Sequence, residues 1–195
     1  MNKQETPMPL TDPRIPPLPE SEWNEEQKDL LESLRRDGHV YNIFATLARH
    51  PQLLKRWLVF AGHVLSKSTL PAREREIVIL RMGCLCRAQY EWGHHVAIGK
   101  QTGLTDDDIK RIQEGPNAAG LDAFEAILLR AVDELHSNTF IGDSTWKALV
   151  QRYNTQQVMD LIFAAGQYKL VSMALNSLGV QLEEGFEGFR NETRG

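Results

Sequence analysis

The chain has 195 residues, of which 42% are hydrophobic and 25% are charged, and it carries a net charge of −4. These values are ordinary for a globular protein and favour one compact domain. Nucleic acid is disfavoured as a partner, because phosphate contacts need clustered lysines and arginines and the sequence has no such cluster.

The first 20 residues hold six of the nine prolines. This composition predicts an extended Pro-rich arm over residues 1–20, which could wrap a neighbouring subunit. The segment lacks the basic and apolar regions of a secretory signal, and the apolar runs elsewhere are far shorter than the roughly 20 residues that span a bilayer. We therefore expect a soluble, cytoplasmic protein that makes no membrane contact.

The rest of the chain shows apolar residues at helical spacing, interrupted by glycine, proline and capping residues. Ser21 is expected to cap the first helix, Pro71 to lie in the first turn of the helix after residue 70, and Asp143-Ser144-Thr145 to cap a later one. Helices are predicted over residues 22–36, 42–50, 52–65, 72–86, 90–101, 105–112, 123–135, 144–153 and 155–178.

No segment alternates with period two, so the sequence predicts an all-α fold, a compact multi-helix bundle over residues 21–182. The helix over residues 52–65 has an apolar face too wide for a helix that mostly faces solvent, so much of it is expected to be buried. The polar tail over residues 183–195 is expected to fray.

Two cysteines, Cys84 and Cys86, are too few for a disulfide framework. On one helix they project about 200° apart, so they should not pair with each other. Both are read as small buried hydrophobic residues in a reducing compartment.

The segment Tyr90-Glu91-Trp92-Gly93-His94-His95 carries the pattern most suggestive of chemistry. Glu91 precedes His94 by three residues and His95 by four, so one helix face holds a carboxylate and two imidazoles. A carboxylate fixes the tautomer of a neighbouring imidazole and raises its basicity, which favours acid–base catalysis. The alternative is a solvent-exposed helix pair of little consequence.

Glu76 is the second notable carboxylate, because it lies on a strongly apolar helix, where a buried charge is costly without a partner. The alternative is an exposed edge position beside Arg73 and Arg75. Periodicity does not decide between the two.

Taken in order, these residues resemble a known superfamily. The series Arg73-x-x-Glu76, Leu80-Arg81 and Tyr90-Glu91-Trp92-x-x-His95, followed by Gly103-Leu104, resembles the carboxymuconolactone decarboxylase and alkylhydroperoxidase D-like superfamily. The similarity covers about residues 12–183. It implies an alkylhydroperoxidase D-like helical bundle and a homo-oligomer, either a trimer or a hexamer.

The peroxidase branch of that superfamily has a Cys-x-x-Cys pair, with a histidine four residues after the second thiol and a glutamate twelve before the first. His95 and Glu76 match the relay positions, whereas Ala88 and Glu91 stand where the thiols would be. A thiol cycle needs a nucleophilic and a resolving sulfur within reach, and Cys84 and Cys86 do not have that placement.

By resemblance to the decarboxylase branch, the expected chemistry uses no metal and no organic cofactor. We expect a lyase, decarboxylase or isomerase that acts on a small organic acid or lactone. His95 would donate or accept the proton, Glu91 would orient it, and Glu76 would be the second acid–base group. Tyr90, Trp92 and His94 would contact the substrate.

A positive field for an anionic substrate could come from Arg73, Arg81 or Arg87. Other aromatic residues are expected to be core or subunit contacts, namely Trp57, Trp146, Phe163 and Tyr168.

Three other interpretations stay open. A diiron-type site could use Glu91-x-x-His94 with Asp133-x-x-His136, which have the acid-x-x-His spacing of helical di-metal bundles. A peroxiredoxin-like antioxidant activity is the second. The third is a non-catalytic helical module that only binds a small ligand.

Overall fold

The structure is a computed structural model that describes residues 10–189, and within this range it contains helices and no strand. An all-α bundle was predicted, and this is confirmed. The elements, in chain order, are η1 (Glu20–Glu22), α1 (Glu25–Glu32), α2 (Asn42–Leu47), α3 (Pro51–Gly62), η2 (His63–Lys67), α4 (Ala72–Leu85), α5 (Gln89–Gln101), α6 (Asp106–Glu114), α7 (Ala123–Asn138), α8 (Asp143–Leu149) and α9 (Thr155–Leu178).

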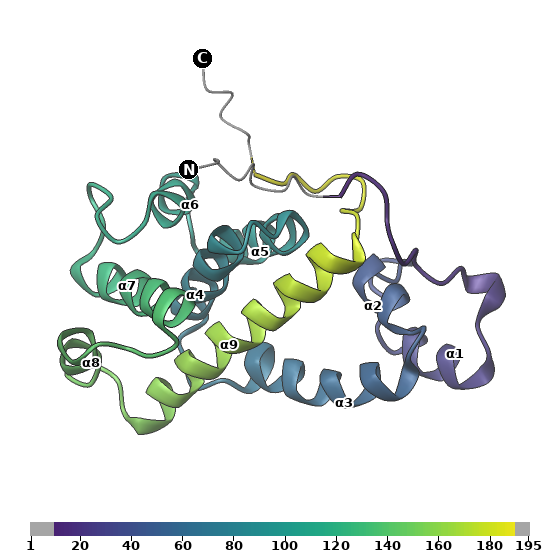
Figure 1. Ribbon diagram of the computed structural model, residues 1–195, viewed down its shortest axis with the longest axis horizontal. Helices are drawn as coiled ribbons and strands as arrows, with labels where there is room; N and C mark the ends of the chain where they lie inside the picture. Colours follow the sequence, from purple (N-terminus) through teal and green to yellow (C-terminus); the bar gives the residue numbers. More distant parts are fainter. Residues whose placement is uncertain (1–9, 190–195) are drawn as a thin grey trace, which may run out of the picture.

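Helix α4 is the centre of the main core, where α5, α7 and α9 pack around it (Figure 1). Because helices cover it on several sides, the run from Glu76 to Gly83 is buried without a break.

A second hydrophobic cluster lies at the N-terminal end of the chain, where α1, α2 and α3 enclose Leu31 and Leu54. Helix α9 lies between this group and the α4–α8 group (Figure 1). The space between the two groups is therefore bordered by elements from distant parts of the sequence.

The first helix differs from the prediction because Ser21 does not cap it. Asn24 accepts a hydrogen bond from the backbone N–H of Gln27, and the Gln27 side chain accepts one from the backbone N–H of Asn24. This reciprocal capping box starts α1 at Glu25, and residues Glu20–Glu22 form a separate 3-10 turn. Likewise, Asp143 is already inside α8, which begins after Gly142.

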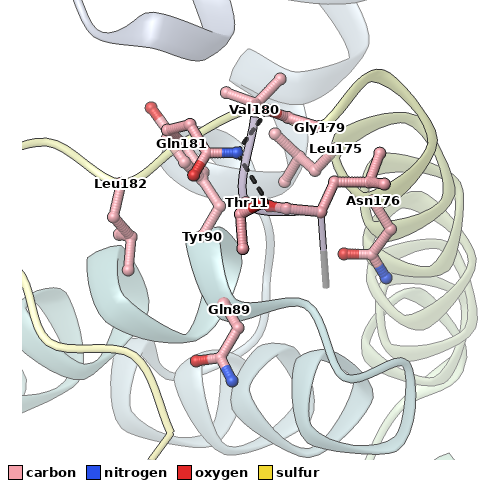
Figure 2. Close-up of a pocket in the computed structure, with 10 residues that line it drawn as sticks. Thr11, Gln89, Tyr90, Leu175, Asn176, Gly179, Val180, Gln181 and Leu182 are labelled. Atoms are coloured by element: carbon pink, nitrogen blue, oxygen red, sulfur yellow. Dashed lines mark hydrogen bonds between the residues drawn. The ribbon is translucent and has the colours of Figure 1, made fainter. Parts of the chain in front are cut away.

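The described part of the N-terminal arm packs on its own subunit. The backbone N–H of Arg14 donates to the carbonyl of Leu178 over 2.9 Å, and Gln181 Nε2 donates to the carbonyls of Leu10 and Gly179 (Figure 2). Residues 10–15 thus lie against the C-terminal end of α9 in the same chain, whereas the backbone N–H of Leu18 donates to the carbonyl of Ala45 in α2. The rest of the predicted arm lies outside the described residues.

The polar tail does not fray between residues 183 and 189. Phe189 packs on Trp92 with ring centroids 4.5 Å apart, and Phe186 packs on His94 at 4.1 Å. Gly93 allows this close approach, because a Cβ atom there would lie 2.8 Å from Leu182 Cδ2. Charge and polarity suggested a free tail, whereas its two phenylalanines attach it to α5.

The outer face of α3 and α9 is apolar and open to solvent. Burial of α3 is only partial, because Leu53, Val59 and Phe60 are exposed. Helix α9 is long and apolar enough to cross a membrane by length and composition alone, but half of its most apolar 18-residue window is buried inside this fold.

Candidate active site

Glu76, Glu91 and His95 meet where α4 packs against α5. His95 Nδ1 lies 2.7 Å from Glu76 Oε2, and His95 Nε2 lies 2.9 Å from Glu91 Oε1. One imidazole is therefore held between two carboxylates. The structure brings together the three residues that the sequence singled out.

The sequence of α5 places Glu91 and His95 one turn apart on the same face. Glu76 comes from α4 and is completely buried, which excludes the exposed edge position. Its second oxygen, Oε1, accepts a hydrogen bond from Arg75 Nε over 3.1 Å. Two cationic partners thus offset the cost of burying this carboxylate.

Burial by itself would lower the pKa of His95, but the hydrogen bonds that its ring donates to Glu76 and Glu91, together with the charges of both carboxylates, raise it to about 9. His95 is therefore an imidazolium at neutral pH. Tyr168 packs edge-on against the ring at 4.9 Å. Burial and the two carboxylates raise the pKa of Tyr168, so its hydroxyl stays neutral.

A cavity of about 500 Å³ opens beside this triad, between α5 and α9 on one side and the α1–α3 group on the other. Glu91 and His95 both line the cavity, whereas Glu76 lies behind His95 and does not. Most of the wall is apolar or aromatic, and it includes Tyr41, Phe44, Trp57, Leu58, Leu65, Ile98, Tyr168 and Val171.

Tyr90 and His94 also line the cavity, but both are held by the C-terminal segment. Glu183 accepts a hydrogen bond from the Tyr90 hydroxyl over 2.7 Å and lies 2.6 Å from His94 Nε2. It also accepts one from the backbone N–H of Asn42. These contacts hold the side chains of Tyr90 and His94 in fixed positions at the wall of the cavity.

Trp92 does not contact the cavity, so its assignment as a substrate-binding residue is wrong for this structure. It is buried in the main core and packs on Phe189. Residues next to each other on a helix project about 100° apart, so Trp92 cannot share the face of both Glu91 and His95.

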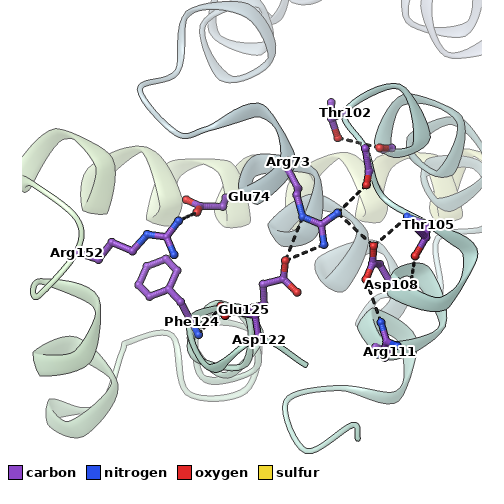
Figure 3. Close-up of polar contacts among 12 residues, drawn as sticks. Arg73, Glu74, Thr102, Thr105, Asp108, Arg111, Asp122, Phe124, Glu125 and Arg152 are labelled. Atoms are coloured by element: carbon purple, nitrogen blue, oxygen red, sulfur yellow. Dashed lines mark hydrogen bonds and ion pairs between the residues drawn. The ribbon is translucent and has the colours of Figure 1, made fainter. Parts of the chain in front are cut away.

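The three arginines proposed to supply a positive field are not at the cavity. Arg73 binds Glu125 and Asp108, as Figure 3 shows, and Arg81 binds Asp133 and two backbone carbonyls. Arg87 is exposed and follows the end of α4.

Two arginines that the sequence did not single out lie near the site. Arg75 pairs with Glu76, and Arg36 lines the cavity from the loop after α1. The Arg75–Glu76 pair joins adjacent residues, so their proximity in the sequence was an available signal. The placement of Arg36 at the cavity is a long-range contact and leaves no local pattern.

Among the described residues that line the cavity there is no cysteine. The Cys84 sulfur lies 3.9 Å from the carbonyl of Gln113, and the Cys86 sulfur lies 3.7 Å from the sulfur of Met82. Burial raises the pKa of both thiols. These are the properties of packed thiols, which are poor nucleophiles at neutral pH.

The two acid-x-x-His pairs do not come together as a metal site. His94 contacts Glu183 and Glu91 contacts His95, while Asp133 is bound to Arg81. Across residues 10–189, no group of three or more His, Cys, Asp or Glu side chains has an arrangement that could hold a metal ion.

Residues 51–133 of the chain match the carboxymuconolactone decarboxylase family, and this range contains Glu76, Glu91 and His95. A comparison with curated proteins finds no match.

Several solved structures share the fold at low sequence identity. An uncharacterized peroxidase-related protein from Silicibacter sp. TM1040 has a TM-score of 0.74 and 18% identity, covering 95% of this chain and 97% of that chain. An alkylhydroperoxidase AhpD core protein from Ralstonia eutropha JMP134 has a TM-score of 0.76 and 16% identity, covering 87% and 93%. A variant of the debrominase Bmp8 in complex with 2,3,4-tribromopyrrole has a TM-score of 0.69 and 13% identity, covering 89% and 94%.

The family match and the shared fold agree with the motif that the sequence displays. Residues 51–133 thus match the carboxymuconolactone decarboxylase family, and the chain as a whole has the fold of the alkylhydroperoxidase D-like structures.

Proposed function

We propose that the protein is an acid–base enzyme, a decarboxylase, lyase or isomerase, that moves protons on a small organic acid or lactone with its own side chains. The observation that carries this proposal is the hydrogen-bonded series Glu76–His95–Glu91, which begins at a fully buried carboxylate and ends at the cavity. An acid and a base at a largely apolar cavity are the groups that such chemistry requires.

The geometry favours different roles for the two carboxylates from those expected. Glu76 has no exposure and holds His95 Nδ1, so it suits a positioning residue that also keeps the imidazole charged. Glu91 lines the cavity and holds His95 Nε2, so it suits the group that exchanges protons with the substrate. His95 would then supply a proton to Glu91 or take one up from it.

The proton balance of a decarboxylation fits this arrangement. When a substrate carboxylate leaves as carbon dioxide, the electrons of the broken C–C bond move into a neighbouring carbonyl and form an enolate. The enolate carbon then takes up one proton, which His95 Nε2 delivers through Glu91 Oε1. A solvent proton restores the imidazolium. In an isomerisation, Glu91 would remove a proton from one carbon and return it to another.

The lining suggests the class of substrate. Aromatic side chains such as Tyr41, Phe44 and Trp57 favour a flat, partly unsaturated molecule, and the exposed guanidinium of Arg36 favours an anionic group near the entrance. A Bmp8 variant of similar fold holds 2,3,4-tribromopyrrole, a flat ring of comparable character. Replacing Arg36 by Gln should raise KM for a carboxylate substrate more than it lowers kcat.

A panel of small lactones, β-oxo acids and unsaturated acids in D₂O tests the proposal. Carbon-bound deuterium or loss of the carboxyl group, followed by NMR, reports proton transfer. We expect Glu91→Gln and His95→Gln to slow turnover by roughly 10²–10⁴-fold. Glu74→Gln is the matched control, since Glu74 is a buried carboxylate of α4 that binds Arg152 and Tyr153 instead. Turnover that survives His95→Gln would refute the proposal.

A thiol peroxidase is the rival favoured by the names of two similar structures. It has less support here, because the cavity lining contains Glu91 and no sulfur within the described chain. A pure binding module is the other rival. It predicts that the panel contains ligands but no substrates, and that His95→Gln leaves their affinity unchanged.

A further inference from the structure

Helix α9 presents a stripe of large apolar side chains to solvent. Met159, Phe163, Leu170 and Met173 are each more than half exposed, although each would be costly to leave in water. Their spacing, with Gly166 included, is four, three, four and three residues. This alternation is that of a coiled-coil seam, which packs against another helix.

The stripe is symmetric in side-chain size about Gly166. Outward from this glycine come Phe163 and Leu170, one on each side, and then Met159 and Met173. An antiparallel copy of the same helix, crossing at Gly166, would therefore place Phe163 against Leu170 and Met159 against Met173. A surface that is complementary to itself in this way fits a two-fold interface.

A groove beside the stripe could receive the apolar side chains of such a partner helix. It has a volume of about 410 Å³ and is lined by Trp57, Phe60, Ile162, Phe163, Gly166, Gln167 and Leu170. Trp57 and Gln167 also line the proposed active cavity. A partner helix in this groove would cover the outer side of a wall that the cavity shares.

The charges on this helix do not oppose pairing. Asp160 is bound by His63 and Thr69, and Lys169 donates to the carbonyl of His136. Both charged groups of the α9 sequence are thus already engaged within the chain. The stripe itself contains no charged residue.

We propose that two copies of the chain associate through antiparallel α9 helices that cross at Gly166, with the α3 face at the edge of the contact. The contact produces a dimer, or an assembly with an even number of subunits that contains this dimer. It excludes a lone trimer. Because the opposite face of α9, which includes Leu161, Ala165 and Tyr168, is already packed in the protomer core, the partner needs only to cover the remaining face.

Sedimentation velocity over a range of concentrations measures the association. A Cβ atom at Gly166 meets nothing within 4 Å in the protomer, so Gly166→Glu should fold normally while it places a carboxylate at the centre of the contact. We expect this variant to weaken the two-fold contact at least about tenfold. Gln113→Glu adds the same charge on the exposed side of α6 and should change nothing.

Disulfide trapping tests the orientation. Two Gly166→Cys chains should form an intermolecular disulfide under mild oxidation, since helices in close contact bring the Cα atoms within about 7 Å. Met159→Cys should cross-link to Met173→Cys in a mixture, and poorly to itself. Wild-type protein, which keeps Cys84 and Cys86, is the background control.

Three outcomes would overturn the proposal. They are a monomer or a lone trimer at all concentrations, an oligomer that Gly166→Glu leaves intact, and flotation of the wild type with phosphatidylcholine vesicles through this face. Efficient Met159→Cys self-linking would contradict the antiparallel arrangement alone.

Discussion

Glu76 and His95 show how a charged group is kept inside an apolar core. Arg75 and His95 each contact one oxygen of Glu76, and Glu91 contacts the other nitrogen of His95. Two positive and two negative groups therefore alternate, which removes most of the penalty for burying any one of them. The same arrangement holds the imidazole in one orientation, as acid–base catalysis requires.

Replacing Glu76 should separate positioning from proton transfer. In Glu76→Gln the imidazole loses one of the two carboxylates that raise its pKa, so the alkaline limb of the kcat/KM profile should move to lower pH than about 9. In Glu91→Gln the rate should fall at every pH. A pH profile of each variant checks this, and identical behaviour of the two would contradict the assignment of roles.

The raised pKa of His95 also predicts how stability depends on pH. The folded-state pKa of about 9 exceeds the ordinary value of 6.5, so the stabilisation is complete below pH 6.5 and is lost as the pH rises through 9. A shift of this size corresponds to a few kcal/mol. Urea unfolding at several pH values should show this loss in the wild type and much less of it in His95→Gln.

The C-terminal segment after α9 holds two helices of the site together through Glu183. Glu183 receives hydrogen bonds from three partners on two helices, and burial, which would raise its pKa, is outweighed by His94, Asn42 and Tyr90, which lower it. The segment therefore stabilises the fold above the ordinary glutamate pKa, and this contribution is lost in acid.

Glu183→Gln should lower the free energy of unfolding by about 1–3 kcal/mol, because it removes the carboxylate that pairs with His94. Glu184→Gln is a matched control with the same charge change at an exposed neighbour, and it should stay within about 0.5 kcal/mol. Thermal or urea unfolding measures both. Equal effects would mean that the segment does not brace the site.

The sequence predicted most helices because their caps and apolar periods are local signals, and α9 was predicted to the residue. It missed two local signals, namely the Asn24-x-x-Gln27 capping box that starts α1 and the helical projection that turns Trp92 away from Glu91. It also failed where distant contacts decide. Arg36 and Tyr168 could not be assigned to the cavity, since only the folded chain brings them to α5.

At the scale of the whole molecule, the site lies between two packed groups of helices, while both cysteines lie away from it. The double variant Cys84→Ser and Cys86→Ser should retain turnover on any substrate that the panel reveals, within about twofold. Wild type and double variant should also reduce peroxide in the presence of thiols at the same background rate. Loss of such a reduction in the double variant would support the peroxidase alternative.

The protonation state of His95 is the quantity on which the proposed chemistry depends most directly. NMR titration of the isotope-labelled histidine ring, assigned with His95→Gln, measures it without a substrate. We expect a pKa of about 9 in the wild type, and lower values in Glu76→Gln and Glu91→Gln. A wild-type value near 6.5 that neither substitution changes would contradict the account.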